Sequence, residues 1–83
     1  GTKEIFLKNI NLLTKKSDLD KNIFVKVRST GNLLEAKIIL QDNNNAKVNL
    51  LKPEDGISPG QACVFYNQDN FGFKVLGGGW IID

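Results

Sequence analysis

The sequence contains no histidine and only one cysteine, Cys63. A single cysteine excludes a disulfide within the chain, and the lack of histidine excludes a zinc site of the Cys/His type. Nucleophilic catalysis needs a base within reach of the nucleophile, and histidine, the usual base, is absent. We therefore predict no catalytic residue and no metal ligand. A lone thiol is typical of a reducing compartment, which predicts a cytoplasmic location.

The sequence also lacks a long apolar stretch and a large excess of one charge. No apolar run approaches the roughly 20 residues of a membrane-spanning helix, and no signal-peptide pattern opens the chain, so no membrane contact is expected. The net charge of +2 is too small to indicate nucleic acid binding by itself. The 83 residues, 41% hydrophobic and 24% charged, predict one globular domain over residues 1–83. Gly1 and Thr2 stand in place of an initiating methionine, which indicates a fragment of a larger protein.

What the sequence does contain is short alternating apolar segments separated by turn-forming residues. Six strands are predicted, at Lys3–Lys8, Ile23–Arg28, Leu33–Leu40, Ala46–Leu50, Ala62–Tyr66 and Phe73–Ile82. Residues 9–21 are interpreted as a long loop, residues 67–72 as a turn, and Ser58–Gln61 as a tight turn with a positive φ at Gly60. The strand Ala62–Tyr66 is apolar on both faces and is expected to be buried on both. Short strands with regular turns indicate an all-β sandwich or barrel.

The second, third and fourth predicted strands have apolar faces of one common phase, which predicts a three-stranded antiparallel meander. Val25 is expected opposite Ala36, and Ile38 opposite Val48, with all four side chains in the core. A slip of one residue would turn these apolar faces into water, so the pairing should be well specified.

Two features invite a chemical role but are better explained as structure. Cys63 lies inside an apolar strand, where a thiol is usually a small core residue with a raised pKa. Gly77–Gly79 is as glycine-rich as a phosphate-binding loop, but such a loop opens a helix, and these glycines lead into Trp80 near the end of the chain. We interpret the triglycine segment as a bend or bulge that another backbone approaches closely.

The basic residues Lys26, Arg28 and Lys37 lie on one polar face of the predicted meander, together with Phe24. Cations beside an aromatic ring on a β face are typical of an RNA-binding surface, so Lys26, Arg28 and Lys37 are the candidate RNA-binding residues. The alternative is an ordinary solvated face, because the predicted pairing places Lys26 opposite Glu35 as a cross-strand ion pair. The residues alone leave both interpretations open.

Two segments carry a resemblance to a known family. Ser58–Tyr66 reads SPGQACVFY, and Val75–Ile81 reads VLGGGWI. Together they resemble the closing signature of the bacterial tRNA-specific 2-thiouridylases, in which a (S/T)PGQ-x-x-VFY segment is followed by LGGG-x-I. Val25–Arg28 is similar to a Lys-(Ile/Val)-Arg strand of that family. Asn9–Leu13 lacks the tryptophan of the family's Asn-Trp pair, and Thr30 stands where a second arginine is common.

This resemblance implies a six-stranded antiparallel barrel, similar to the second-domain barrels of translation factors. It implies a non-catalytic C-terminal domain that helps to hold tRNA while other domains thiolate the wobble uridine. The parent enzyme would use ATP with magnesium, two catalytic cysteines and a sulfur-carrier protein. No cofactor is expected in the present chain, which has neither the phosphate loop nor the cysteine pair.

Two other functions remain open at this point. The barrel could be purely structural and pack against the N-terminal domains of the parent chain without contacting RNA. It could also be a free-standing ligand-binding barrel, although the interior of so small a barrel should be filled by its own side chains.

Overall fold

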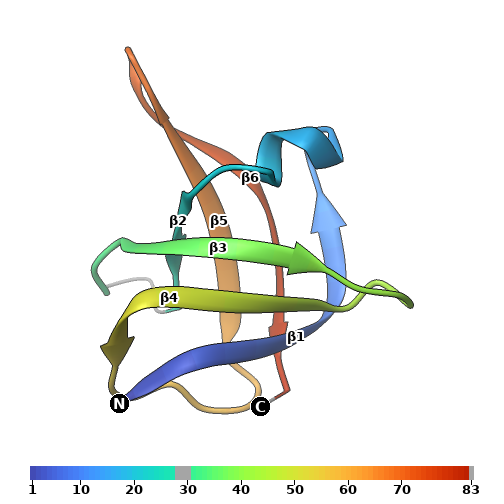
Figure 1. Cartoon of the computed structure of the whole chain (residues 1–83), viewed down its shortest axis with the longest axis vertical. Helices are drawn as coiled ribbons and strands as arrows, with labels where there is room; N and C mark the ends of the chain where they lie inside the picture. The colour runs from blue at the N-terminus through green and yellow to red at the C-terminus, as the bar shows by residue number, and fades with distance from the viewer. Residues whose placement is uncertain (28–30, 83) are drawn as a thin grey trace.

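The computed structural model describes residues 1–27 and 31–82 and has the form of a closed β-barrel (Figure 1). Its elements are β1 (Thr2–Leu12), the 3₁₀ helix η1 (Lys16–Leu19), β2 (Ile23–Lys26), β3 (Leu34–Leu40), β4 (Ala46–Glu54), β5 (Ala62–Asp69) and β6 (Gly72–Ile81). All neighbouring strands are antiparallel, in the order β1-β4-β3-β2-β5-β6, and β6 closes onto β1. The predicted six-stranded antiparallel barrel is confirmed. Within the described residues, no helix has the length and apolar character needed to cross a membrane.

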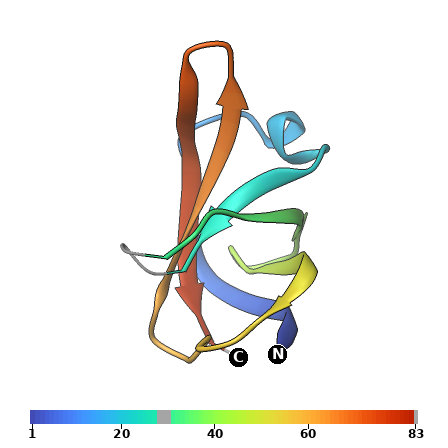
Figure 2. The ribbon, with the colours of Figure 1, turned by 90° about the vertical axis from the view of Figure 1, so that its left-hand side faces the viewer.

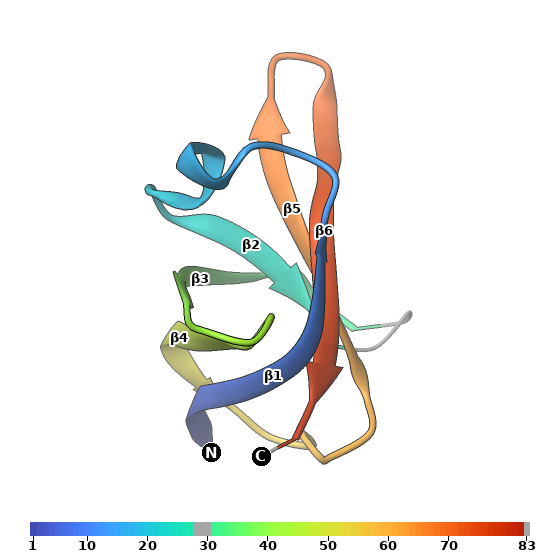
Figure 3. The same ribbon diagram turned by 90° about the vertical axis from the view of Figure 1, so that its right-hand side faces the viewer.

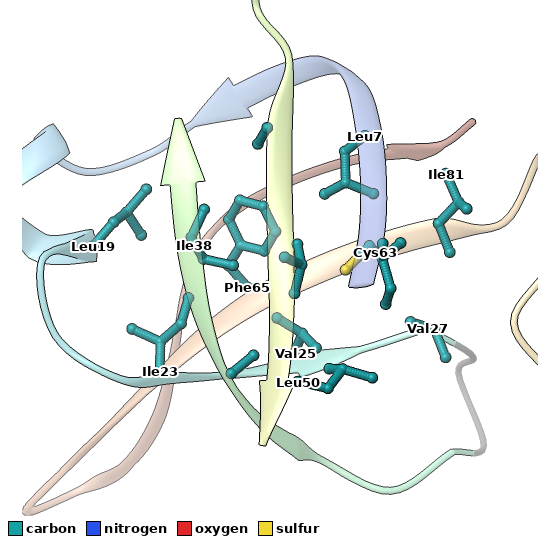
Figure 4. Packing of buried hydrophobic residues seen from close by; sticks show 14 of the residues in the cluster. Leu7, Leu19, Ile23, Val25, Val27, Ile38, Leu50, Cys63, Phe65 and Ile81 are labelled. Carbon is teal, nitrogen blue, oxygen red and sulfur yellow. The ribbon is translucent and has the colours of Figure 1, made fainter. Parts of the chain in front are cut away.

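The interior of the barrel is filled by the apolar side chains that alternate along the strands (Figure 4). The buried core consists of Ile5, Leu7, Leu19, Ile23, Val25, Val27, Ala36, Ile38, Ala46, Val48, Leu50, Cys63, Phe65, Leu76 and Ile81. Phe65 is the largest fully buried side chain, and Leu19 brings η1 against the same cluster. Such filling is the expected arrangement for a small barrel whose strands alternate between inward and outward residues.

The pairing of β3 with β4 is the predicted one, with Ile38 opposite Val48. The pairing of β2 with β3 differs from the prediction, because Val25 lies opposite Leu34 and not opposite Ala36. The predicted pairing is therefore wrong by two residues. A slip of two keeps every side chain on its own face of the sheet, and Val25 and Ile38 are buried as expected. Alternation of apolar residues cannot distinguish these two registers.

The observed register between β2 and β3 changes which residues are cross-strand neighbours on the polar face of the meander. Glu35 lies opposite Phe24, so the predicted cross-strand pair between Glu35 and Lys26 is wrong. The Glu35 carboxylate instead accepts a hydrogen bond from the side-chain amide of Asn22, at 3.2 Å.

The ends and the burial of the other strands also differ from the prediction. β1 continues to Leu12 through an irregularity at Asn9, whose φ is 54°, so the first part of the predicted loop is strand. η1 occupies a later part of that loop. β5 is buried on one face only: Cys63 and Phe65 point into the core, whereas Ala62 is exposed. The prediction of burial on both faces is therefore wrong.

β5 and β6 form a hairpin that projects well beyond the rest of the barrel (Figures 2 and 3). The strands stay paired as far as Asp69 and Gly72, so the predicted turn at 67–72 is reduced to its central residues. The Asp69 carboxylate accepts a hydrogen bond from the backbone N–H of Phe71, at 2.8 Å. Gly72 follows with a φ of 121°, which favours glycine. Phe71 at the tip is 97% exposed.

The turn at Ser58–Gln61 has the predicted form. Gly60 has a φ of 90°, and the Gln61 backbone N–H donates to the Ser58 carbonyl oxygen at 3.4 Å. Two further backbone hydrogen bonds of 2.8 Å connect Gly60 and Gln61 to Ile81. The turn is thereby fastened to the end of β6, at the end of the barrel where both termini lie (Figure 1).

Candidate nucleic-acid interface

The predicted RNA-binding lysines lie on the outer surface of the barrel, on two adjacent strands. Lys26 ends β2 and is half-buried, whereas Lys37 is exposed in the middle of β3. They are not direct cross-strand neighbours, because Phe24 and Glu35 form the ladder position between them. Arg28 lies outside the described residues. The two lysines therefore form separate positive points and not one compact cluster.

Neither lysine is neutralised by a carboxylate in residues 1–27 and 31–82. Lys26 lies opposite Val64, and Lys37 lies opposite Asn49. The ion pairs in this part of the chain join the N-terminal amine to Asp55, at 3.5 Å, and Lys47 to Glu4, at 3.3 Å. Both lysines are therefore available to an anionic ligand such as a phosphate group.

Phe24 belongs to an aromatic contact that sequence reasoning missed. Its ring meets that of Phe73 edge-on, with centroids 5.7 Å apart and ring planes at 90°. Tyr66 lies opposite Phe24 on β5. The contact depends on β2 pairing with β5 and on β6 lying beyond it, and no local pattern reveals this order of strands. Phe24 is half-buried and in contact with Phe73, so it is not an open platform for a stacked base.

The triglycine segment lies at the seam where β6 closes the barrel. Gly77 pairs with Leu12 of β1, and the register between β5 and β6 shifts beside it. A Cβ atom on Gly77 would overlap the carbonyl oxygen of Asn11, and one on Gly78 would lie 2.5 Å from the carbonyl oxygen of Cys63. The predicted bulge with close backbone approach is confirmed. The segment lies within a strand with neighbouring backbone packed against it, so these residues do not fit a nucleotide phosphate.

Cys63 points into the core from β5 (Figure 4) and has none of its surface exposed. Burial raises the pKa of its thiol from 9.0 to about 12. The reactive form of cysteine is the thiolate, which this environment suppresses. Within the described ranges, no three cysteine or acidic side chains lie close enough together to hold a metal ion.

The burial of Cys63 leads to a prediction about its reactivity. At pH 8 the fraction of Cys63 present as thiolate should be about a thousandfold lower than for a cysteine with the ordinary pKa of 9.0. Each pKa unit changes this fraction by a factor of ten. Alkylation by iodoacetamide, followed by mass spectrometry, should therefore be very slow in buffer and fast in concentrated urea. Equally fast alkylation of the folded chain would show that Cys63 is accessible.

The same pKa fixes the direction of a pH effect on stability. The folded state binds the Cys63 proton more tightly than the unfolded state does. This group's contribution to stability is therefore complete below pH 9 and is lost as the pH rises towards 12.

Comparison with known proteins identifies relatives of the whole chain. A family model described as the aminomethyltransferase beta-barrel domain matches residues 2–81. The tRNA-specific 2-thiouridylase MnmA of Dinoroseobacter shibae is 45% identical over 98% of this chain and 21% of that protein. The proteins of the same name from Ruegeria pomeroyi and Orientia tsutsugamushi are 52% and 46% identical, over 72% and 86% of this chain and 16% and 17% of theirs. The chain thus spans about a fifth of the length of these relatives.

Proposed function

Because the chain belongs to the aminomethyltransferase beta-barrel domain family and matches the C-terminal domain of tRNA-specific 2-thiouridylases, we propose that it is the accessory domain that positions tRNA in such an enzyme. The parent enzyme would thiolate the wobble uridine of tRNA in the cytoplasm. The domain would hold the tRNA through its sugar-phosphate backbone while the other domains of the same chain perform the chemistry.

One observation carries the RNA-binding role, namely the two lysines that no carboxylate neutralises in the described part of the chain. Lys26 and Lys37 place two ammonium groups on the outside of adjacent strands. Arg28, two residues after Lys26 in the sequence, is proposed as the third contact. Lysine binds phosphate as a point charge, and such contacts orient a protein on RNA without reading its sequence. With a net charge of only +2, the domain should add to the affinity of the whole enzyme and not bind tightly alone.

The chemistry itself is proposed to lie outside this chain. The chain has no histidine, and its one thiol is buried with a raised pKa. The glycine-rich segment lies within strand β6 and does not open a helix, so ATP with magnesium would bind to other domains of the parent. The same domains would receive sulfur from a carrier protein through a pair of cysteines that the present chain does not contain.

The RNA-binding role can be tested in the full-length 2-thiouridylase that contains this domain. The double variant Lys26→Glu/Lys37→Glu should raise the KM for tRNA about tenfold, which corresponds to about 1.4 kcal/mol of binding free energy, and leave kcat nearly unchanged. The slope of log K against log salt concentration should fall by about one for each phosphate that the variant no longer binds. Steady-state kinetics with unmodified tRNA, at several salt concentrations, measures both effects.

The control for this test is Lys3→Glu/Lys16→Glu, which changes the net charge equally at exposed positions on β1 and η1. This control should leave the KM close to that of the wild-type enzyme. An unchanged KM in a stably folded Lys26→Glu/Lys37→Glu enzyme would contradict the RNA-binding role and favour a purely structural barrel.

A further inference from the structure

The outer surface of the barrel is divided into a charged part and an uncharged part. On β5 and β6 the outward side chains Ala62, Val64, Tyr66, Phe73, Val75 and Trp80 contain no charged group, and we call this set the uncharged face. Phe73, Val75 and Trp80 are 49%, 42% and 49% exposed. The face is continuous, because Ala62 lies opposite Trp80 and Tyr66 opposite Val75.

The uncharged face is hollowed where the triglycine segment crosses it. An open groove of about 260 Å³ lies above Gly78, which has no side chain to fill it. Trp80, Val75 and Leu13 line the groove, and Leu13 is 65% exposed. Asn9 and Asn11 also line the groove. The rest of its lining is apolar or backbone, which suits an inserted apolar side chain.

The opposite side of the barrel has the composition of an ordinary solvated surface. Glu4 on β1 forms its ion pair with Lys47 on β4, and Lys37 and Glu35 are exposed on β3. Exposed apolar residues scattered singly among such charges need no explanation, but a continuous apolar patch marks an interaction site. The contrast between the two sides therefore assigns a binding role to β5 and β6.

We propose that the uncharged face docks onto an apolar surface of the remaining polypeptide of the 2-thiouridylase to which this domain belongs. The chain accounts for only 16% to 21% of the length of its relatives, so most of the polypeptide of such an enzyme is available to cover this face. A partner in the same chain is held at high effective concentration, so a patch of modest area is sufficient. An RNA partner would need cations across the face, whereas Lys26 and Lys8 lie at its two edges, opposite Val64 and Trp80.

This inference rests on membership in the 2-thiouridylases and not on the proposed contacts between lysine and phosphate. Docking through β5 and β6 leaves Lys37 on β3 open to solvent, whereas Lys26 lies at the edge of the docked face, opposite Val64. Lys37 therefore stays available to RNA when the face is docked.

The test is hydroxyl-radical footprinting of the full-length enzyme without tRNA, with oxidation of Trp80 as the signal. Trp80 should be protected in the wild-type enzyme. Val75→Glu places a charge in the docked surface and should raise the rate of Trp80 oxidation about tenfold, because an unpaired charge in an interface weakens association by at least that factor. Ile39→Glu is the matched control, since Ile39 is an outward β-branched residue on β3 that is 38% exposed, against 42% for Val75.

Protection of Trp80 that is lost in Val75→Glu and kept in Ile39→Glu would support the proposal. If Val75→Glu does not fold, Ala62→Glu repeats the test at an exposed position opposite Trp80. Fast oxidation of Trp80 in the wild-type enzyme would overturn docking. Protection that arises only when tRNA is added would assign the face to RNA, and protection that depends on enzyme concentration would assign it to a second copy. Either result would overturn the proposal.

Discussion

Gly77→Ala is expected to prevent the barrel from closing. The new Cβ atom would overlap the carbonyl oxygen of Asn11 and lie 3.0 Å from the Cα atom of Leu12, both in the backbone of β1. Backbone in a paired strand cannot move aside as the end of a flexible side chain can. The φ of 145° adds strain of about 1–3 kcal/mol for any residue other than glycine.

We expect Gly77→Ala to lower the free energy of unfolding by at least about 4 kcal/mol, in the range of the exceptional single substitutions. An 83-residue domain has a total stability of about 4–12 kcal/mol. The variant should therefore lose at least about a third of its stability, as measured by urea unfolding followed by circular dichroism.

Gly72→Ala is the control that separates backbone strain from overlap. Gly72 has a φ of 121°, but nothing lies within 4 Å of a Cβ atom placed on it. This variant should lose only the strain contribution, about 1–3 kcal/mol. If the two variants unfold at the same urea concentration, the close approach of β1 to β6 does not limit stability.

Phe65→Ala is expected to destabilise the core by about 3–5 kcal/mol, the usual cost of removing a large buried aromatic ring. Phe65 is fully buried and is the largest such side chain in the barrel. Its truncation leaves a cavity among side chains contributed by several strands, and the closed barrel can collapse around this cavity only in part. Urea unfolding of the variant gives the change directly.

Phe71→Ala makes the same chemical change at the tip of the hairpin, where the ring is 97% exposed. Its effect on unfolding should stay within about 0.5 kcal/mol. Comparable losses in the two variants would mean either that Phe71 packs in solution or that Phe65 is not in the core.

The sequence was sufficient to predict the class of the fold and the inward side of each strand. Val25, Ile38 and Val48 alternate with polar residues, and a pattern of period two defines the face that is buried. It was not sufficient for the register between β2 and β3, because a slip of two residues preserves that face. The observed pairing of Val25 with Leu34 also requires β2 to fit against β5, which lies far along the chain.

The candidate site shows the same limit. That Lys26 and Lys37 are on the surface followed from alternation, but whether they adjoin each other depended on the register. The contact of Phe24 with Phe73 was missed because it depends on the strand order β2-β5-β6, which local patterns do not reveal. The residues Asn67, Asp69 and Asn70 favour turns, so the sequence does not indicate that β5 and β6 stay paired as far as Asp69 and Gly72. Pairing with the opposite strand overrides the local preference of Asn67 and Asp69 for turns.

The pairing of β1 with β6 has a consequence for how the chain acquires its structure. These are the first and last strands, so the contacts that complete the barrel join residues at the greatest separation in the sequence. Closing so long a loop is entropically costly before the contacts repay it, and folding should take milliseconds to seconds, as in other all-β domains. During translation, β1 and β5 would each present an unpaired edge until residue 81 leaves the ribosome. A product truncated before β6 would keep both edges and should aggregate through them.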